Sequence, residues 1–220
     1  MLEAPVFHLL WCLDAQRKGM VIKMGKKNVL YDKTCAERII FIRQGKGNKK
    51  DKISQDKLAA RFRTENCKIS RDTIADIESG VRDIFDIEVF WFAKVLNVPL
   101  NYLLGITDQY NGTDLEYEPQ IDPSMKDRKN ICGTWIREAR YHQEKDSISQ
   151  QELAKQMTES GIEMSYYTIL YIESGKRRVS LTELKHFARI LNKPLEYLLK
   201  GTNPKLPNIE SFESFAAEDN

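Results

Sequence analysis

The segment SYYTILYIESG at residues 165–175 decides the fold, because a similar segment, SRDTIADIESG, stands 95 residues earlier at residues 70–80. Both begin with serine, which favours the N-cap of a helix, and both end at glycine, which tolerates the left-handed turn after a helix. In each, isoleucines at the fifth and eighth positions are spaced to share one helical face. Each segment therefore predicts a short helix with one buried side.

The likeness extends well beyond these two segments. Residues 54–104 and 149–199 align without a gap and are identical at 22 of 51 positions. The motifs SQDKLA and SQQELA open the two stretches, while FAKVLNVPLNYLL and FARILNKPLEYLL close them. Internal repetition on this scale predicts two copies of one structural unit.

Helix signals fill most of each copy, and no alternating strand pattern competes with them. Ser180 with Glu183 and Ser149 with Glu152 have capping-box spacing, whereas Phe85 stands at the matching cap of the first copy, so this helix must begin differently. We predict an all-α fold with five helices in each copy. The predicted helices lie near 35–43, from 54, at 70–80, 86–97 and 100–104, and near 132–142, from 149, at 165–175, 181–192 and 195–199. The expected core includes Phe92, Leu96, Leu103, Phe187, Leu191 and Leu198.

Charge varies along the chain, although 34 basic and 32 acidic residues leave a net charge of only +2. The two copies are mildly basic and the segments after them are acidic, which fits a polyanionic partner and equally fits a solvated mixed-charge surface. The predicted parts are an N-terminal extension at 1–34, a first domain at 35–105, an acidic linker at 106–130, a second domain at 131–201 and an acidic tail at 202–220.

The N-terminal extension shows no sustained period, and we expect it to be disordered in part or residues 1–23 to be an over-extended start. Its apolar run at 6–13 is too short to span a bilayer and follows no basic segment, so no membrane or export role is expected. The four cysteines, Cys12, Cys35, Cys67 and Cys132, form no CxxC pair. We expect reduced thiols in a cytoplasmic protein.

Catalytic motifs are missing from the sequence. It has three histidines, none at metal-ligand spacing, no phosphate-cradling glycine loop and no nucleophile motif. We expect neither an enzyme nor a bound metal or cofactor.

The linked motifs SQxxLA, SxxTIxxIExGxR and FAxxLNxPLxYLL resemble the Xre/Cro-repressor family of helix-turn-helix DNA-binding domains, over about 140 residues. The resemblance implies two tandem five-helix lambda-repressor-like domains. It also implies sequence-specific binding of double-stranded DNA and a role as a repressor-like transcriptional regulator of a prokaryote or phage. The stretch between Ala59 and Ser70 is longer than the tight turn of the simplest members, as is its counterpart.

In such domains the third helix lies in the major groove. Burial of the isoleucines turns the other residues of this helix outward. The expected base-facing residues are Ser70, Arg71, Asp72 and Asp76 in the first copy and Ser165, Tyr166, Tyr167 and Tyr171 in the second. Alternatively, Arg71 pairs with its neighbouring aspartates, and the tyrosines form a protein interface.

Phosphate contacts are expected from basic and polar side chains around the third helix. They are Arg43, Gln55, Thr73, Arg82, Arg140, Gln150, Thr168, Lys176, Arg177 and Arg178. The basic residues could instead compensate helix C-terminal charge. Glu78 and Glu173 are expected to be structural, bonding nearby backbone or an arginine.

Two copies with different outward residues predict an asymmetric DNA target, unless only one copy reads DNA. The linker could reach about 80 Å when extended and roughly 25–30 Å as a coil, enough to span one turn of DNA. The rival function is a helical adaptor or anti-regulator that uses the tyrosine face. A homodimer or a protein partner could also form through the second domain or the tail.

Overall fold

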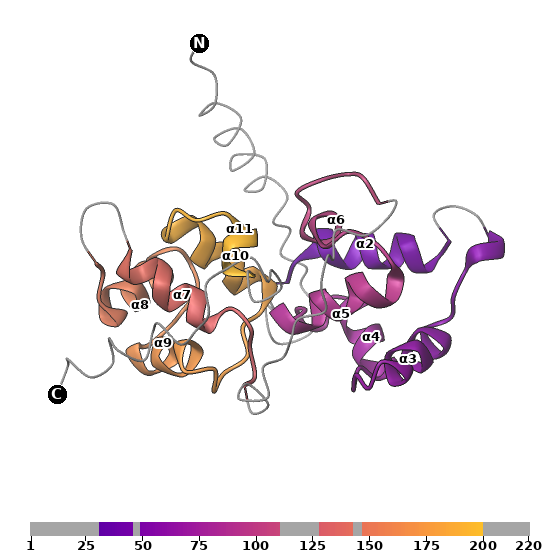
Figure 1. Ribbon diagram of the computed structural model, residues 1–220, viewed down its shortest axis with the longest axis horizontal. Coiled ribbons are helices and arrows are strands. Elements are labelled where there is room, and N and C mark those ends of the chain that lie inside the picture. Colours follow the sequence, from indigo (N-terminus) through magenta and orange to yellow (C-terminus); the bar gives the residue numbers. More distant parts are fainter. Residues whose placement is uncertain (1–30, 46–48, 111–127, 143–146, 200–220) are drawn as a thin grey trace, which may run out of the picture.

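The computed structural model describes residues 31–45, 49–110, 128–142 and 147–199. The expected over-extended start at 1–23, residues 111–127 of the predicted linker and the acidic tail at 202–220 lie outside the described residues. Within these ranges the chain forms helices and no strand, so the all-α prediction is confirmed for them (Figure 1).

The helices form two series in the same order. We call residues 31–110 the first repeat and residues 128–199 the second repeat. The first repeat contains α2 (Lys33–Arg43), the 3-10 helix η1 (Lys49–Asp51), α3 (Gln55–Thr64), α4 (Arg71–Glu78), α5 (Asp86–Leu96) and α6 (Leu100–Leu104). The second repeat contains α7 (Gly133–Tyr141), α8 (Gln150–Glu159), α9 (Tyr166–Glu173), α10 (Leu181–Ile190) and α11 (Leu195–Leu198).

Serine caps begin helices where the sequence predicts them. At α10 the full capping box is confirmed, since Glu183 N–H donates to Ser180 Oγ at 3.2 Å and Ser180 N–H donates to the Glu183 carboxylate at 3.0 Å. At α8 only half of the predicted box forms. Ser149 Oγ accepts the N–H of Glu152 at 3.1 Å, but the Glu152 carboxylate accepts from the Gln156 side chain at 2.9 Å.

One glycine follows the third helix of each repeat, and the two glycines show how closely the repeats correspond. Gly80 and Gly175 have φ of +71° and +76°, a region that disfavours residues with a Cβ. A Cβ at Gly80 would meet the ring of Tyr31 at 2.5 Å, and one at Gly175 would meet Cγ of Arg128 at 2.7 Å. Tyr31 and Arg128 therefore occupy equivalent places.

Each repeat buries its own apolar centre. In the first, the rings of Phe62 and Phe92 meet edge to face with centroids 4.9 Å apart, and both are fully buried. In the second, Met157 and Phe187 are fully buried at the corresponding positions. The predicted core is confirmed: all six of its side chains are buried, namely Phe92, Leu96, Leu103, Phe187, Leu191 and Leu198.

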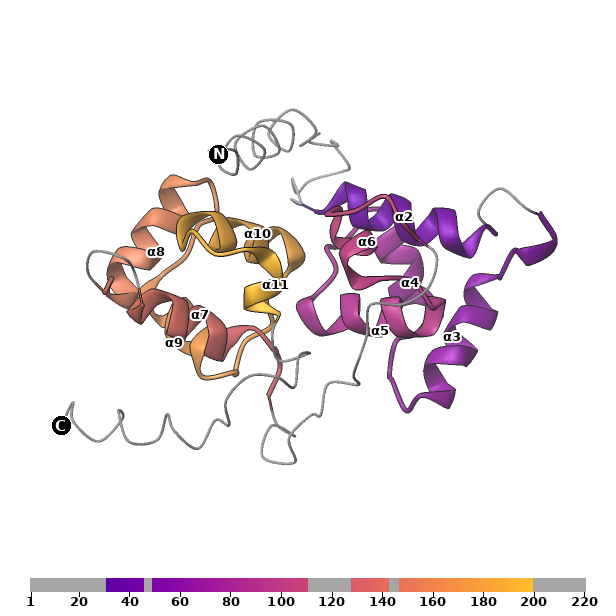
Figure 2. The same ribbon diagram turned by 45° about the horizontal axis from the view of Figure 1, so that its top comes forward.

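The two repeats meet where their fourth helices begin. Asp86 N–H donates to the carbonyl of Val179 at 3.0 Å, and Leu181 N–H donates to the carbonyl of Ile84 at 2.8 Å. Residues 84 and 86 correspond to residues 179 and 181, so each hydrogen bond is the symmetry equivalent of the other. The repeats thus pair about a pseudo-two-fold axis that passes between Phe85 and Ser180, and they lie side by side in both views (Figures 1 and 2).

Two aspartate side chains of the first repeat add contacts at this junction that have no equivalent from the second repeat. Asp86 is buried and its carboxylate accepts the N–H groups of Ile131 and Cys132 at 2.7 and 3.1 Å. Asp83 accepts the N–H of Thr182 at 2.9 Å. The sequence equivalents of the two aspartates are Arg178 and Leu181, which offer no acceptor of this kind.

Residues just outside the predicted domains at 35–105 and 131–201 also make contacts with the repeats. Arg38 donates to the carbonyl of Thr107 and pairs with Asp108 at 2.6 Å, while Lys129 N–H donates to the carbonyl of Gly175 at 2.7 Å. Thr107 and Asp108 therefore pack on the first repeat, and Lys129 packs on the second. The hydrogen bonds at the start of α5 and α10 hold the two repeats against each other.

Candidate nucleic-acid interface

Helices α4 and α9 bury the isoleucines that the sequence assigns to the core and expose the residues between them. Ile74, Ile77, Ile169 and Ile172 are 0–2% exposed. The serine caps also form, since Ser70 and Ser165 accept the N–H three residues on at 3.1 and 3.2 Å. Their partners are Thr73 and Thr168.

The same serines and threonines are also linked through their hydroxyl groups. The Ser70 and Thr73 hydroxyls are 3.0 Å apart, and the Ser165 and Thr168 hydroxyls are 3.1 Å apart. Four predicted DNA contacts are therefore part of helix caps, and their hydroxyls serve the first turn of each helix.

The outward faces of the two helices differ in chemistry. Arg71 and Asp72 are exposed and form an ion pair of 3.3 Å, and Asp76 is half-buried on the same helix. This pair matches the alternative expected for that face. On α9, Tyr166, Tyr167 and Tyr171 are 38%, 65% and 47% exposed, and the first two rings meet edge to face.

A buried arginine–glutamate–glutamine network supports the third helix of the first repeat. Arg43 is only 8% exposed and donates to both carboxylate oxygens of Glu78, at 2.5 and 2.7 Å. Its remaining nitrogen donates to the carbonyl of Ile53 at 2.9 Å. The Gln55 side chain donates to the same carboxylate at 2.8 Å.

The second repeat contains the same network. Arg140, 5% exposed, donates to Glu173 at 2.8 and 3.0 Å and to the carbonyl of Ile148 at 2.7 Å, and Gln150 donates to Glu173 at 2.6 Å. Burial alone would lower the pKa of Arg140, but hydrogen bonds and charge from Glu173 outweigh it and raise that pKa.

Four of the predicted phosphate ligands thus take part in hydrogen bonds inside the repeats. The guanidiniums of Arg43 and Arg140 are buried and pair with the carboxylates of Glu78 and Glu173. Gln55 and Gln150 hold the same carboxylates from the start of α3 and α8. The structural role expected for Glu78 and Glu173 agrees with the geometry, because each joins three helices of its repeat.

Two more predicted phosphate ligands are paired within the chain. Arg82 lies 2.8 Å from Glu88, and Arg177 lies 2.8 Å from Glu183. The arginine and the glutamate of each pair are identical in the two aligned copies. This shared identity could have predicted the ion pairs, whereas spacing along a single helix could not. Both arginines thus bind the carboxylate at the start of the fourth helix.

Lys176 and Arg178 keep the exposure that a phosphate contact needs. The Arg178 guanidinium lies 5.2 Å from the ring centre of Phe85, so this arginine sits at the junction of the repeats.

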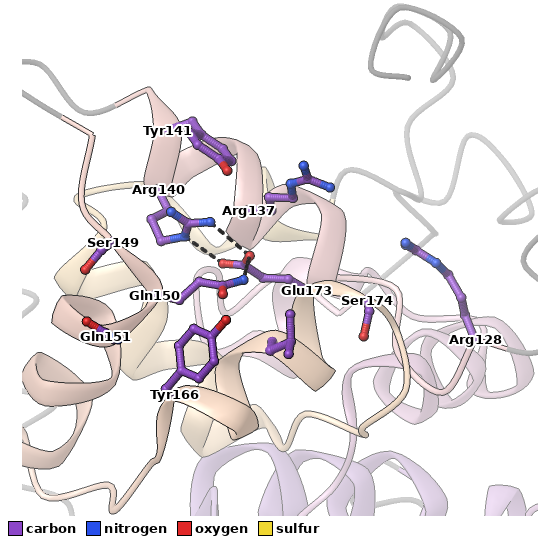
Figure 3. A pocket seen from close by; sticks show the side chains of 11 residues that line it. Arg128, Arg137, Arg140, Tyr141, Ser149, Gln150, Gln151, Tyr166, Glu173 and Ser174 are labelled. Carbon is purple, nitrogen blue, oxygen red and sulfur yellow. Dashed lines mark hydrogen bonds and ion pairs between the residues drawn. The ribbon is translucent and has the colours of Figure 1, made fainter. Parts of the chain in front are cut away.

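A pocket of about 600 Å³ opens over the buried network of the second repeat (Figure 3). Arg140, Glu173 and Gln150 form its floor, and the Tyr166 hydroxyl points towards them. The other lining residues are Arg128, Arg137, Tyr141, Ser149, Gln151, Leu170 and Ser174. Sequence reasoning missed Arg128, Arg137 and Tyr141, because they lie outside the motif that contains the third helix.

Other kinds of site have less support in the described part of the chain. It contains no group of three or more His, Cys, Asp or Glu side chains arranged for a metal ion. None of its helices has the length and apolar character needed to cross a membrane. Cys35, Cys67 and Cys132 are free thiols, and burial raises the pKa of each.

Comparison with protein-family models, curated proteins and solved structures finds no match to this chain.

Proposed function

We propose that this chain binds double-stranded DNA in a sequence-specific manner through two helix-turn-helix units, as a transcriptional regulator of the repressor type. The observation that carries the proposal is the pseudo-two-fold pairing of the repeats. Helices α4 and α9 lie towards the same edge of the molecule, one on each side of the α5–α10 contact, whereas α6 and α11 lie towards the opposite edge (Figure 1). One duplex could therefore meet both helices.

The major groove is wide enough for one α-helix, and paired recognition helices read half-sites about one helical turn apart. In α4 and α9 the inner face is buried, and a buried ion pair holds the helix from below. A rigidly held helix with a free outer face suits insertion into a groove. The expected base-facing residues keep that role in the proposal, with the serines acting mainly as caps.

The two units are proposed to read different bases. Arg71 can donate two hydrogen bonds to a guanine, and a nearby aspartate can accept from a cytosine amino group. The tyrosines of α9 can contact thymine methyl groups and phosphates. The preferred site is thus two unlike half-sites at a fixed separation.

Selection of bound sequences from a random duplex pool tests this proposal. We expect enrichment of one asymmetric site, and binding that falls steeply with salt because phosphate contacts release counterions. Failure to retain any duplex at low salt would contradict DNA binding.

A protein-binding adaptor is the second candidate, and the exposed tyrosines of α9 favour it. Large aromatic side chains at the surface are typical of protein interfaces. Substitution of Tyr167, the most exposed of the three, separates the two functions. If Tyr167→Ala abolishes binding to a protein partner and the chain has no duplex affinity, the adaptor function stands.

A further inference from the structure

The pocket of the second repeat contains two cations that are not neutralised by described residues. Arg140 on its floor is matched by Glu173. Arg128 and Arg137 line the same pocket, and neither forms an ion pair with a carboxylate in the described part of the chain. Its walls therefore have a local charge of about +2 that an anion would balance.

Arg128 is held in place by the fold. Its stem lies against Gly175, where a Cβ would come within 2.7 Å, and its guanidinium donates to the Thr134 hydroxyl at 2.5 Å. Partial burial lowers the pKa of Arg128, because its charge is only partly solvated. A half-buried guanidinium with one neutral acceptor has several N–H groups left to donate to an anion.

Arg137 approaches from α7, one turn before Arg140. Its guanidinium lies 5.7 Å from the ring centre of Tyr141, and Arg140 lies 4.4 Å from the same ring. Figure 3 shows Arg137 and Tyr141 along one side of the pocket and Tyr166 along the other. The cations and the hydroxyl therefore come from three different segments around one opening.

The start of α8 adds backbone donors to the same pocket. Gln150 and Gln151 line it and are the first two residues of a ten-residue helix capped by Ser149. The N–H groups of a first helical turn lack intrahelical acceptors and carry partial positive charge. Arginine forks, a hydroxyl and helix N–H groups together suit the several oxygens of a phosphate.

The first repeat lacks these features at the corresponding positions. Tyr31 and Ile40 replace the two arginines, and Asp56 replaces Gln151. Tyr31 packs on Gly80 as Arg128 packs on Gly175, so the replacement is structural as well as aligned. These cationic and amide residues therefore occur together in the second repeat only.

We propose that this pocket binds a phosphate group through Arg128 and Arg137, and that the second repeat thereby anchors the protein on its ligand. The inference deepens the proposed function and rests on it where the phosphate comes from a DNA strand. A free phosphorylated molecule offers the same chemistry, and the pocket has room for a sugar beside the phosphate.

Titrations of the full chain with inorganic phosphate and with a short mixed-sequence duplex test the inference. Amide NMR shifts follow the first probe and fluorescence anisotropy follows the second. Arg137→Ala removes an exposed cation, Arg128→Gln keeps most of the stem against Gly175, and Lys155→Ala is the control on an exposed face of α8. Thermal unfolding establishes that each variant is folded.

For each probe that binds the pocket, we expect either arginine substitution to weaken its binding about tenfold or more. Lys155→Ala should have little effect on the binding of either probe. Arginine-dependent binding of inorganic phosphate without duplex binding would support the pocket while contradicting the DNA proposal. Equal duplex affinity of parent and variants, with no phosphate-induced shifts at Gln150 and Gln151, would overturn the inference and leave DNA binding intact. If neither probe binds the parent chain, both proposals fail.

Discussion

Phe85 and Ser180 hold the same position in the two repeats and face each other across an antiparallel bridge. The two hydrogen bonds of this bridge are related by the same 95-residue offset as the repeats themselves. A contact of this kind is normally made between two identical subunits. Here one chain supplies both sides, so the separation of α4 and α9 is fixed by packing.

Fixed separation predicts strict spacing of the two half-sites. Inserting five base pairs, about half a helical turn, should turn one half-site away from its helix and reduce affinity towards that of a single repeat. Electrophoretic mobility shift with the selected site and its insertions measures the effect. Asp83→Ala removes a junction contact and should make affinity less sensitive to the insertion. If the insertion leaves the affinity of the parent chain unchanged, the rigid pairing of the repeats is contradicted.

Removal of one partner from the buried ion pair should strongly destabilise the second repeat. Glu173→Ala leaves the Arg140 guanidinium buried without a counter-charge, at a cost of roughly 3–5 kcal/mol in the free energy of unfolding. Urea unfolding measures it, with the exposed Glu159→Ala as the control. A change below about 1 kcal/mol would mean that Arg140 reaches solvent easily.

The junction should become more stable as pH falls from 7 towards 4. Burial raises the pKa of Asp86 from 3.8 to about 6, although the N–H groups of Ile131 and Cys132 oppose the shift. A raised folded-state pKa means that the folded chain binds a proton more tightly than the unfolded chain, so the added stability is full below 3.8 and is lost as pH rises through 6. The difference is on the order of 3 kcal/mol.

Replacement of Asp86 isolates this contribution to pH dependence. Asp86→Leu introduces the residue found at the aligned position 181 and removes the titrating group. Subtracting its pH profile of unfolding free energy from that of the parent should leave a slope confined to pH 4–6. Parallel profiles of parent and variant would show that Asp86 titrates normally.

Base-reading and phosphate-binding residues should give different signatures in DNA binding. Arg71→Ala should relax preference at one base position, by about 1–3 kcal/mol, with less effect on nonspecific duplex. Lys176→Ala and Arg178→Ala should weaken all sequences alike and reduce the slope of log affinity against log salt by about one each. Arg177→Ala is not equivalent, because Arg177 pairs with Glu183 and its loss also removes a structural contact.

Local sequence was sufficient for the helices and their buried faces. Serine caps and isoleucine spacing act between residues three or four apart, and the structure confirms the all-α fold and the named core within the described residues. The repeat itself was also visible, since identical residues recur at one offset. These features need no knowledge of where the rest of the chain lies.

Tertiary structure alone decided which charged side chains remain available to a partner. Arg43 and Arg178 look alike in sequence, yet the first meets Glu78 across 35 residues and the second stays exposed beside Phe85. The contact between Phe85 and Ser180 likewise joins segments that are far apart in the chain. The same holds for the pocket of the second repeat, where Arg128 and the start of α8 line one opening. The physical reason is that helix caps and the spacing of apolar residues depend only on residues close together in the chain. The desolvation of a charge and the identity of its counter-ion depend instead on every segment that packs around it.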